Sequence, residues 1–78
     1  MSEAASAEAL VEFIARAIVT QPDRVRATPV EDGRVIELET SDEDRGRVIG
    51  RQGRVAKAMR AVLGASRCGT GVRLEIVD

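Results

Sequence analysis

Apolar residues near the start of the chain recur with the period of an α-helix. They occupy positions i, i+3, i+4, i+7 and i+8 and so share one face: Leu10, Phe13, Ile14, Ala17 and Ile18. Ser6 is a suitable N-cap for this helix, and Thr20-Gln21-Pro22 is a stop signal. The pattern predicts a helix over about residues 5–20 whose apolar stripe, Phe13 included, packs into the core.

The pattern then changes to the two-residue alternation of β-strands. Two such runs flank Glu31-Asp32-Gly33, and an Asp-Gly pair in this position predicts a hairpin. Ile36 and Leu38 share one face of the second strand. Pro29 cannot donate a backbone hydrogen bond, so the first strand is expected at an edge of the sheet.

Two helices and a last strand are predicted after the hairpin. Ser41 and Asp44 have the spacing of a capping pair that opens a short helix. This helix ends near Gly50, with Val48 and Ile49 facing inward. The next helix begins near residue 53 or 54, and its apolar stripe consists of Val55, Ala58, Met59 and Val62. Residues 72–78 alternate again, which indicates a strand.

The order α-β-β-α-α-β predicts an α+β fold in a single domain over residues 1–78. Two helices separate the second and third strands, so these strands can pair in parallel, whereas the hairpin pairs the first two antiparallel. We expect a three-stranded mixed sheet with three helices on one face. The chain is 44% apolar but has one aromatic residue, so its core should be thin and association with another chain would stabilise it.

Charge is divided sharply along the chain. Residues 1–44 contain 4 Arg and 11 acidic residues, a net charge of −7, whereas residues 45–78 contain 7 Arg, 1 Lys and 2 acidic residues, a net charge of +6. Residues 45–67 contain seven basic residues and no acidic one. A stretch of one sign produces a strong local field, which favours a polyanion as the partner.

The segment Gly50-Arg51-Gln52-Gly53 lies at the centre of this basic stretch, between the two predicted helices. Glycines allow positive φ and a close approach of a ligand's backbone, and a helix N-terminus favours anions. Neighbouring side chains add positive charge: Arg47, Arg51, Arg54 and Lys57. Two glycines at this spacing are a weak signal alone, but the basic flanks favour an anion-binding loop. The segment is not a nucleotide-binding P-loop, because it has no Gly-Lys pair and follows no strand.

These residues resemble the KH domain. The segment GRVIGRQGR between two helices, inside the order α-β-β-α-α-β, is similar to the type II form of that domain. KH domains hold about four nucleotides on a GxxG loop, here at residues 50–53. The segments QPDRVR, SDEDRGRVIGRQGRVAKAMRAV and VRLEIVD extend the resemblance, over nearly the whole chain, to the KhpA family of small bacterial single-KH proteins.

The resemblance implies binding of single-stranded RNA, as an RNA chaperone or post-transcriptional regulator in the cytoplasm. It implies two kinds of protein partner: a second copy in a homodimer, and KhpB (also called Jag or EloR), a larger KH-containing protein. In some bacteria the pair acts on cell elongation, cell shape and cell wall or envelope homeostasis.

The resemblance also implies roles for individual residues. Gly50, Arg51, Gln52 and Gly53 would form the phosphate-contacting loop, with Val48 and Ile49 as the apolar wall of the base groove. Arg47 and Arg54 would flank the phosphates, and Lys57 lies one turn further on. The loop before the last strand, residues 66–71, lacks the lysines that relatives often have there. With Phe13 expected in the core, no aromatic ring would stack on bases, so we expect weak and salt-sensitive binding.

Other functions fit the sequence less well. The chain has no histidine, and helix caps and solvent-facing strand positions explain its acidic residues, so we expect no enzyme, cofactor or metal. The single cysteine, Cys68, excludes an internal disulfide, and we expect it to be an inert loop residue. With no apolar run of about 18 residues, no membrane association is expected. Two alternatives stay open: a protein-interaction module with little RNA binding, and a helix-turn-helix-like DNA binder.

Overall fold

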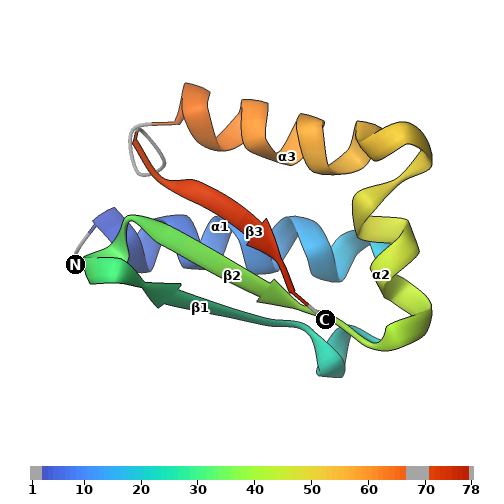
Figure 1. Ribbon diagram of the computed structural model, residues 1–78. Coiled ribbons are helices and arrows are strands. Elements are labelled where there is room, and N and C mark those ends of the chain that lie inside the picture. The colour runs from blue at the N-terminus through green and yellow to red at the C-terminus, as the bar shows by residue number, and fades with distance from the viewer. Residues whose placement is uncertain (1–2, 67–70, 78) are drawn as a thin grey trace.

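The computed structural model of the chain describes residues 3–66 and 71–77. Its elements follow the predicted order and are α1 (Glu3–Ile18), β1 (Arg26–Val30), β2 (Val35–Glu39), α2 (Asp42–Ile49), α3 (Arg54–Ala65) and β3 (Arg73–Ile76), with 3-10 turns at Pro22–Arg24, Glu31–Gly33 and Arg51–Gly53 (Figure 1). The expectation for Cys68 lies outside the described residues, as does most of the loop before β3.

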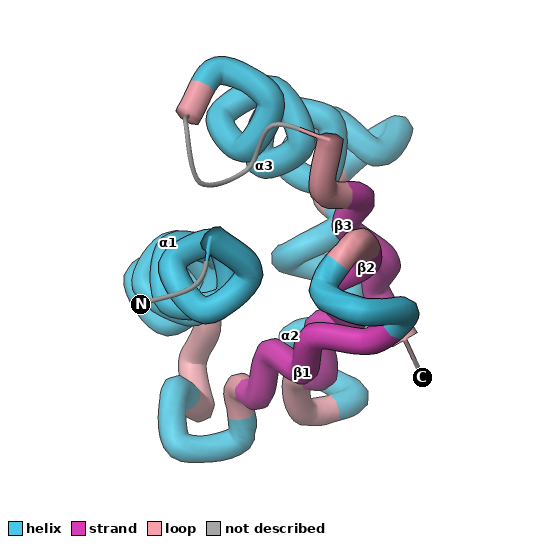
Figure 2. Tube along the Cα trace, turned by 90° about the vertical axis from the view of Figure 1, so that its left-hand side faces the viewer, coloured by secondary structure: helices cyan, strands magenta, loops and turns pink. Residues whose placement is uncertain are grey.

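The three strands form one mixed sheet in the order β1-β2-β3. β1 and β2 pair antiparallel from Arg26↔Glu39 to Val30↔Val35, and β2 and β3 pair in parallel. The helices cover one face of the sheet, with α1 and α3 side by side (Figure 2). The α+β fold, the parallel crossover and the position of Pro29 on an edge strand are therefore confirmed.

The apolar stripes predicted for α1 and α3 are correct only in part. Met59 is buried, and Leu10, Ile14 and Val55 are half-buried against the core, but the most buried line of each helix lies about one position away. On α1 the fully buried residues are Ala7, Val11 and Ala15, whereas Phe13 is 75% exposed. The small alanines allow α1 to lie close to the sheet, and no room for a phenyl ring is left between them. On α3 the buried residues are Ala56, Met59 and Leu63, and Val62 is half-exposed. Most of the side chains predicted for the core therefore line the space between α1 and α3.

The ends of α1 also differ from the prediction. The helix begins at Glu3, so Ser6 lies inside it and is not the N-cap. Its last helical hydrogen bond runs from the N–H of Val19 to the carbonyl of Ala15, at 3.2 Å. The helix ends there because the next two N–H groups, of Thr20 and Gln21, donate to the side chain of Asp44 instead.

The core between helices and sheet consists of aliphatic side chains, of which the largest fully buried are Ile36, Leu38, Leu63 and Leu74. Within the described residues, none of the helices is long and apolar enough to span a bilayer. The thin core expected from the composition is confirmed, because the one aromatic side chain lies outside it.

Candidate nucleic-acid interface

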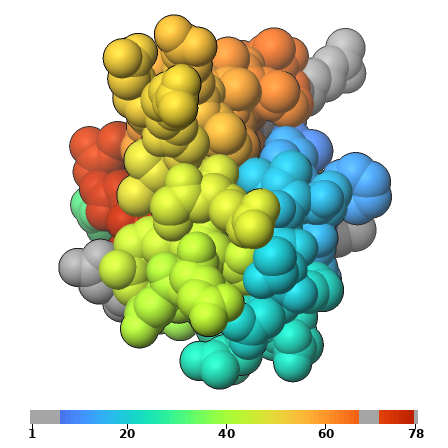
Figure 3. Space-filling view, turned by 90° about the vertical axis from the view of Figure 1, so that its right-hand side faces the viewer, coloured from blue at the N-terminus to red at the C-terminus, as the bar shows by residue number. Residues whose placement is uncertain are grey.

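The candidate loop follows directly from a well-capped α2. The hydroxyl of Ser41 accepts a hydrogen bond from the N–H of Asp44 at 3.3 Å, as the capping pattern predicts. α2 ends where the N–H of Gly50 donates to the carbonyl of Gly46 at 2.8 Å. The residues of the loop then protrude beside the end of α2, in yellow at the top of Figure 3.

Gly50 occupies a position that no other residue can take. Its φ of 78° and ψ of 169° lie in a region of backbone conformation that is essentially restricted to glycine. A Cβ placed on it would be 2.5 Å from Cγ2 of Val55 and 2.8 Å from the backbone nitrogen of Val55. Gly50 therefore lets the start of α3 pack directly against the end of α2.

Gln52 and Gly53 turn the chain into α3 through left-handed conformations, with φ of 57° and 73°. The N–H of Gly53 donates to the carbonyl of Gly50, and the N–H of Arg54 donates to that of Arg51. The N–H groups of Arg51 and Gln52 have no partner among the described residues. Among the residues that the structure describes, no side chain caps the start of α3. The loop thus presents unpaired donors at the positive end of a helix, which suits an oxyanion.

Most of the predicted cationic side chains lie around this loop. Arg51, Gln52, Arg54 and Lys57 are exposed, and an Nη of Arg54 lies 3.5 Å from Oε1 of Gln52. Arg47 is also exposed, but its Nε lies 3.5 Å from a carboxylate oxygen of Asp44. Arg47 therefore already has an ion-pair partner, whereas the exposed side chains of Arg51, Arg54 and Lys57 can reach a ligand.

Of the two residues predicted to form an apolar wall, Val48 and Ile49, only Ile49 reaches the surface. Val48 has no exposed surface and belongs to the core, so it cannot offer a surface to a base. Ile49 is 38% exposed, although it was expected to face inward. Because the two residues are consecutive on a helix, they point about 100° apart, and only one of them can pack inside.

Asp44 is a structural residue of the site that sequence reasoning treated only as part of a helix cap. Its carboxylate is fully buried and accepts four hydrogen bonds of 3.0 Å, from the N–H and hydroxyl of Thr20, the N–H of Gln21 and the hydroxyl of Ser41. The N–H of Thr20 contributes most to lowering the pKa of Asp44, opposed by burial and assisted by the other donors. Through these hydrogen bonds Asp44 connects the start of α2 to the end of α1.

The requirement for glycine at position 50 can be tested by comparing Gly50→Ala with Gly53→Ala. Both positions have positive φ, but a Cβ on Gly53 meets no atom within 4 Å. We expect Gly50→Ala to lower the free energy of unfolding by at least about 2 kcal/mol more than Gly53→Ala, because the clash adds to the backbone strain. Urea denaturation measures the difference, and equal losses for the two variants would contradict the steric explanation.

Comparison with known proteins agrees with this geometry. A family model described as "KhpA/KhpB, KH domain" matches residues 8–76. The "RNA-binding protein KhpA" of Halalkalibacterium halodurans is 47% identical over 73 residues, covering 88% of this chain and 96% of that protein. Proteins of the same name from Treponema pallidum and Streptomyces coelicolor are 43% and 42% identical, each over 91% of this chain and more than 90% of their own length. No solved structure matches at a significant level. Since the family model and these relatives cover nearly the whole chain, the protein belongs to the KhpA/KhpB family of KH-domain proteins.

Proposed function

We propose that this protein binds single-stranded RNA and holds its sugar–phosphate backbone on the loop Gly50–Gly53. The observation that supports this most directly is the pair of unpaired N–H groups, of Arg51 and Gln52, beside an uncapped helix start. The relatives described above bear the name RNA-binding protein, and the proposal extends that property to this chain. Binding of this kind makes and breaks no covalent bond, which is consistent with a protein that is not an enzyme.

Each predicted residue has a distinct part in this proposal. Gly50 and Gly53 add no side chain to the loop, so a phosphate can approach the backbone donors between them. Arg51, Arg54 and Lys57 neutralise phosphates, and Arg47 assists when its ion pair with Asp44 opens. Ile49 offers the apolar surface for a base, and Val48 supports it from the core.

Salt dependence tests the proposal directly. If about four phosphates are neutralised, the logarithm of the association constant should fall against the logarithm of salt concentration with a slope near −3. Fluorescence anisotropy with a short labelled RNA measures this slope, with duplex RNA and duplex DNA of the same sequence as controls. A flat salt response would contradict phosphate binding, and tighter binding of duplex DNA would support the helix-turn-helix alternative.

We further propose that the protein acts in the cytoplasm as an RNA chaperone or post-transcriptional regulator, together with a KhpB-like protein. One loop of this size contacts few nucleotides, so a partner with its own RNA-binding surface would raise the affinity through effective concentration. The matched family model includes the KH domains of both KhpA and KhpB. Effects on cell elongation and envelope homeostasis would then be consequences of altered RNA use.

In-cell crosslinking tests this wider proposal. The native protein would be recovered after crosslinking, its RNA sequenced and its protein partners identified from the same sample. We expect RNA fragments together with a KhpB-like chain. Recovery of protein partners without RNA would instead support the interaction-module alternative.

A further inference from the structure

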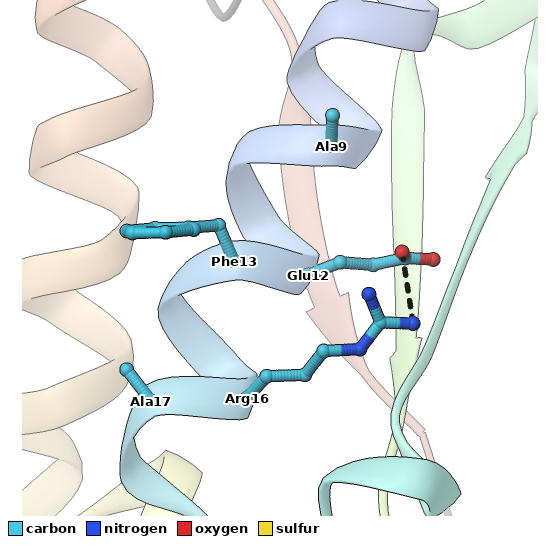
Figure 4. Close-up of a pocket in the computed structure, with 5 residues that line it drawn as sticks. All are labelled: Ala9, Glu12, Phe13, Arg16 and Ala17. Atoms are coloured by element: carbon cyan, nitrogen blue, oxygen red, sulfur yellow. Dashed lines mark ion pairs between the residues drawn. The ribbon is translucent and has the colours of Figure 1, made fainter.

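A helix side chain bonds to each edge of the sheet, but the two edges differ in charge. At the edge formed by β1, the N–H of Ala27 donates to the carboxylate of Glu12 at 3.3 Å. Figure 4 shows Glu12 and Arg16 reaching from α1 toward the sheet, joined by an ion pair of 3.3 Å. At the edge formed by β3, Nε of Arg60 on α3 donates to the carbonyl of Leu74 at 3.3 Å. Arg16 thus has a carboxylate partner, whereas Arg60 has none among the described residues.

The bond to Leu74 determines which atoms of Arg60 are free. Nε is the donor, so the two terminal nitrogens, Nη1 and Nη2, have no partner within the part of the chain that the structure describes. The side chain of Arg60 is exposed, and α3 contains no acidic residue. Arg60 therefore presents a planar pair of donors whose charge is not neutralised and whose position is fixed by the edge of β3.

Arg60 lies on the same face of α3 as the end of the glycine loop. It follows Gly53 by seven residues, which is nearly two turns, so the two positions lie one above the other, about 10 Å apart along the helix. Lys57 lies on this face between them, and a Cβ added to Gly64, one turn beyond, would meet no atom within 4 Å. Four nucleotides stacked about 3.4 Å apart extend about 10 Å, so a strand that is held on the loop and follows this face reaches Arg60.

We infer that Arg60 is a base-recognition residue whose two free nitrogens select guanine in the bound strand. The inference rests on the proposed function, since it assigns one base of the RNA that the loop would hold. Guanine presents two adjacent acceptors, O6 and N7, which match the paired donors of an arginine. Adenine and cytosine each place an amino group at the corresponding edge, and uracil offers a single acceptor there. Guanine is therefore the base that this arginine fits best.

A base suits the position of Arg60 better than a phosphate does. The phosphates are assigned to the unpaired N–H groups of the loop, beside Arg51 and Arg54. Arg60 instead reaches across to β3, a strand that also contacts α2, the helix on which Ile49 offers apolar surface. If the backbone lies on the loop and one base rests on Ile49, the bases that follow are directed toward β3.

Fluorescence anisotropy with short oligouridine RNAs, each with one guanosine at a different position, tests the inference. For the wild type we expect guanosine in one register to raise the affinity at least about 5-fold over plain oligouridine, and adenosine there to give little gain. Replacing that guanosine with 7-deazaguanosine, which lacks the N7 acceptor, should remove most of the gain. In Arg60→Lys the ratio of the two affinities should approach one, because the charge is kept and the paired donors are lost.

Lys57→Ala is the matched control for Arg60→Lys. Lys57 lies one turn earlier on the same face of α3 and is assigned to a phosphate. Its loss should weaken the binding of all these RNAs about equally and leave the preference for guanosine intact. Circular dichroism confirms that each variant is folded, and the measurement with 7-deazaguanosine requires no variant.

The outcomes separate this inference from the proposed function. A folded Arg60→Lys that weakens the binding of all the RNAs equally and keeps the guanosine preference would overturn the inference, since Arg60 would then contact a phosphate or support β3 alone. Binding of oligouridine with a salt slope near −3 but without any guanosine preference would contradict this inference and leave the proposed function standing. Absence of binding to any of the RNAs would contradict both.

Discussion

Replacing Arg51 and Gln52 together with aspartate is expected to abolish RNA crosslinking and to lower affinity for single-stranded RNA at least about 30-fold. The two substitutions change the charge at the tip of the loop by three units. They place carboxylates beside the N–H groups that we assign to phosphate binding, so they add repulsion to the loss of a cation. Both side chains are exposed, and neither contacts the core.

The fold should tolerate this double substitution. Gln52 has a φ of 57°, and aspartate adopts this left-handed conformation more readily than most residues. Arg24→Asp, in the exposed turn Pro22–Arg24, gives the same charge change as Arg51→Asp at a position remote from the loop. Arg24→Asp should have only a small effect on RNA affinity. Unchanged RNA recovery with the double variant would show that the loop is not the phosphate site.

The second large effect is expected at Asp44. Replacing it with alanine would leave four buried or half-buried donors without an acceptor, on Thr20, Gln21 and Ser41. Such donors are costly to leave unpaired, so the midpoint of thermal unfolding should fall by on the order of 10 °C. RNA affinity should fall as well, because the position of α2 determines where the loop lies. Asp42→Ala is the matched control, since Asp42 is an exposed neighbour that pairs with Arg45 on its own helix.

The lowered pKa of Asp44 leads us to expect a pH-dependent stability. Its pKa is lower in the folded protein than the ordinary value of 3.8, chiefly because the N–H of Thr20 donates to its ionised form. A group with a lowered pKa stabilises the fold in its ionised form. The contribution of Asp44 to the free energy of unfolding is therefore complete above about pH 4 and is lost as the pH falls through the pKa of the folded protein. The stability difference between wild type and Asp44→Asn should therefore be constant from pH 7 to about 5 and shrink below pH 4. Urea denaturation across this range measures it, and a difference that grows in acid would contradict the assignment.

The order and pairing of the elements were predictable because they depend on local signals. Asp32-Gly33 turns the chain between two alternating runs, Pro29 excludes β1 from the centre of the sheet, and Ser41 caps α2. Each of these effects arises from the backbone of a few consecutive residues. The same holds for the loop, since Gly50 and Gly53 have the positive φ that glycines at this spacing allow.

The orientation of the helices about their own axes was not predictable in the same way. Phe13 was expected inside, because it lies on the most hydrophobic stripe of α1, yet the buried stripe is the one with Ala7, Val11 and Ala15. Hydrophobicity measures the gain from burial, but the separation of helix and sheet limits the size of the side chains that fit between them. Ile49 and Val62 also differ from expectation, because on each helix the adjacent residue, Val48 or Leu63, takes the position that faces the core.

The sequence by itself therefore determined the α-β-β-α-α-β order, the mixed sheet, the cationic stretch and the glycine loop at its centre. These features follow from turn conformation, capping and charge, which act over a few residues. Only the tertiary structure decided that Val48 is core, that Asp44 joins α2 to the end of α1 across 24 residues of chain, and that Phe13 lies on the surface. Each of these depends on which segments distant in the sequence come into contact, and at what separation, so no local pattern contains it.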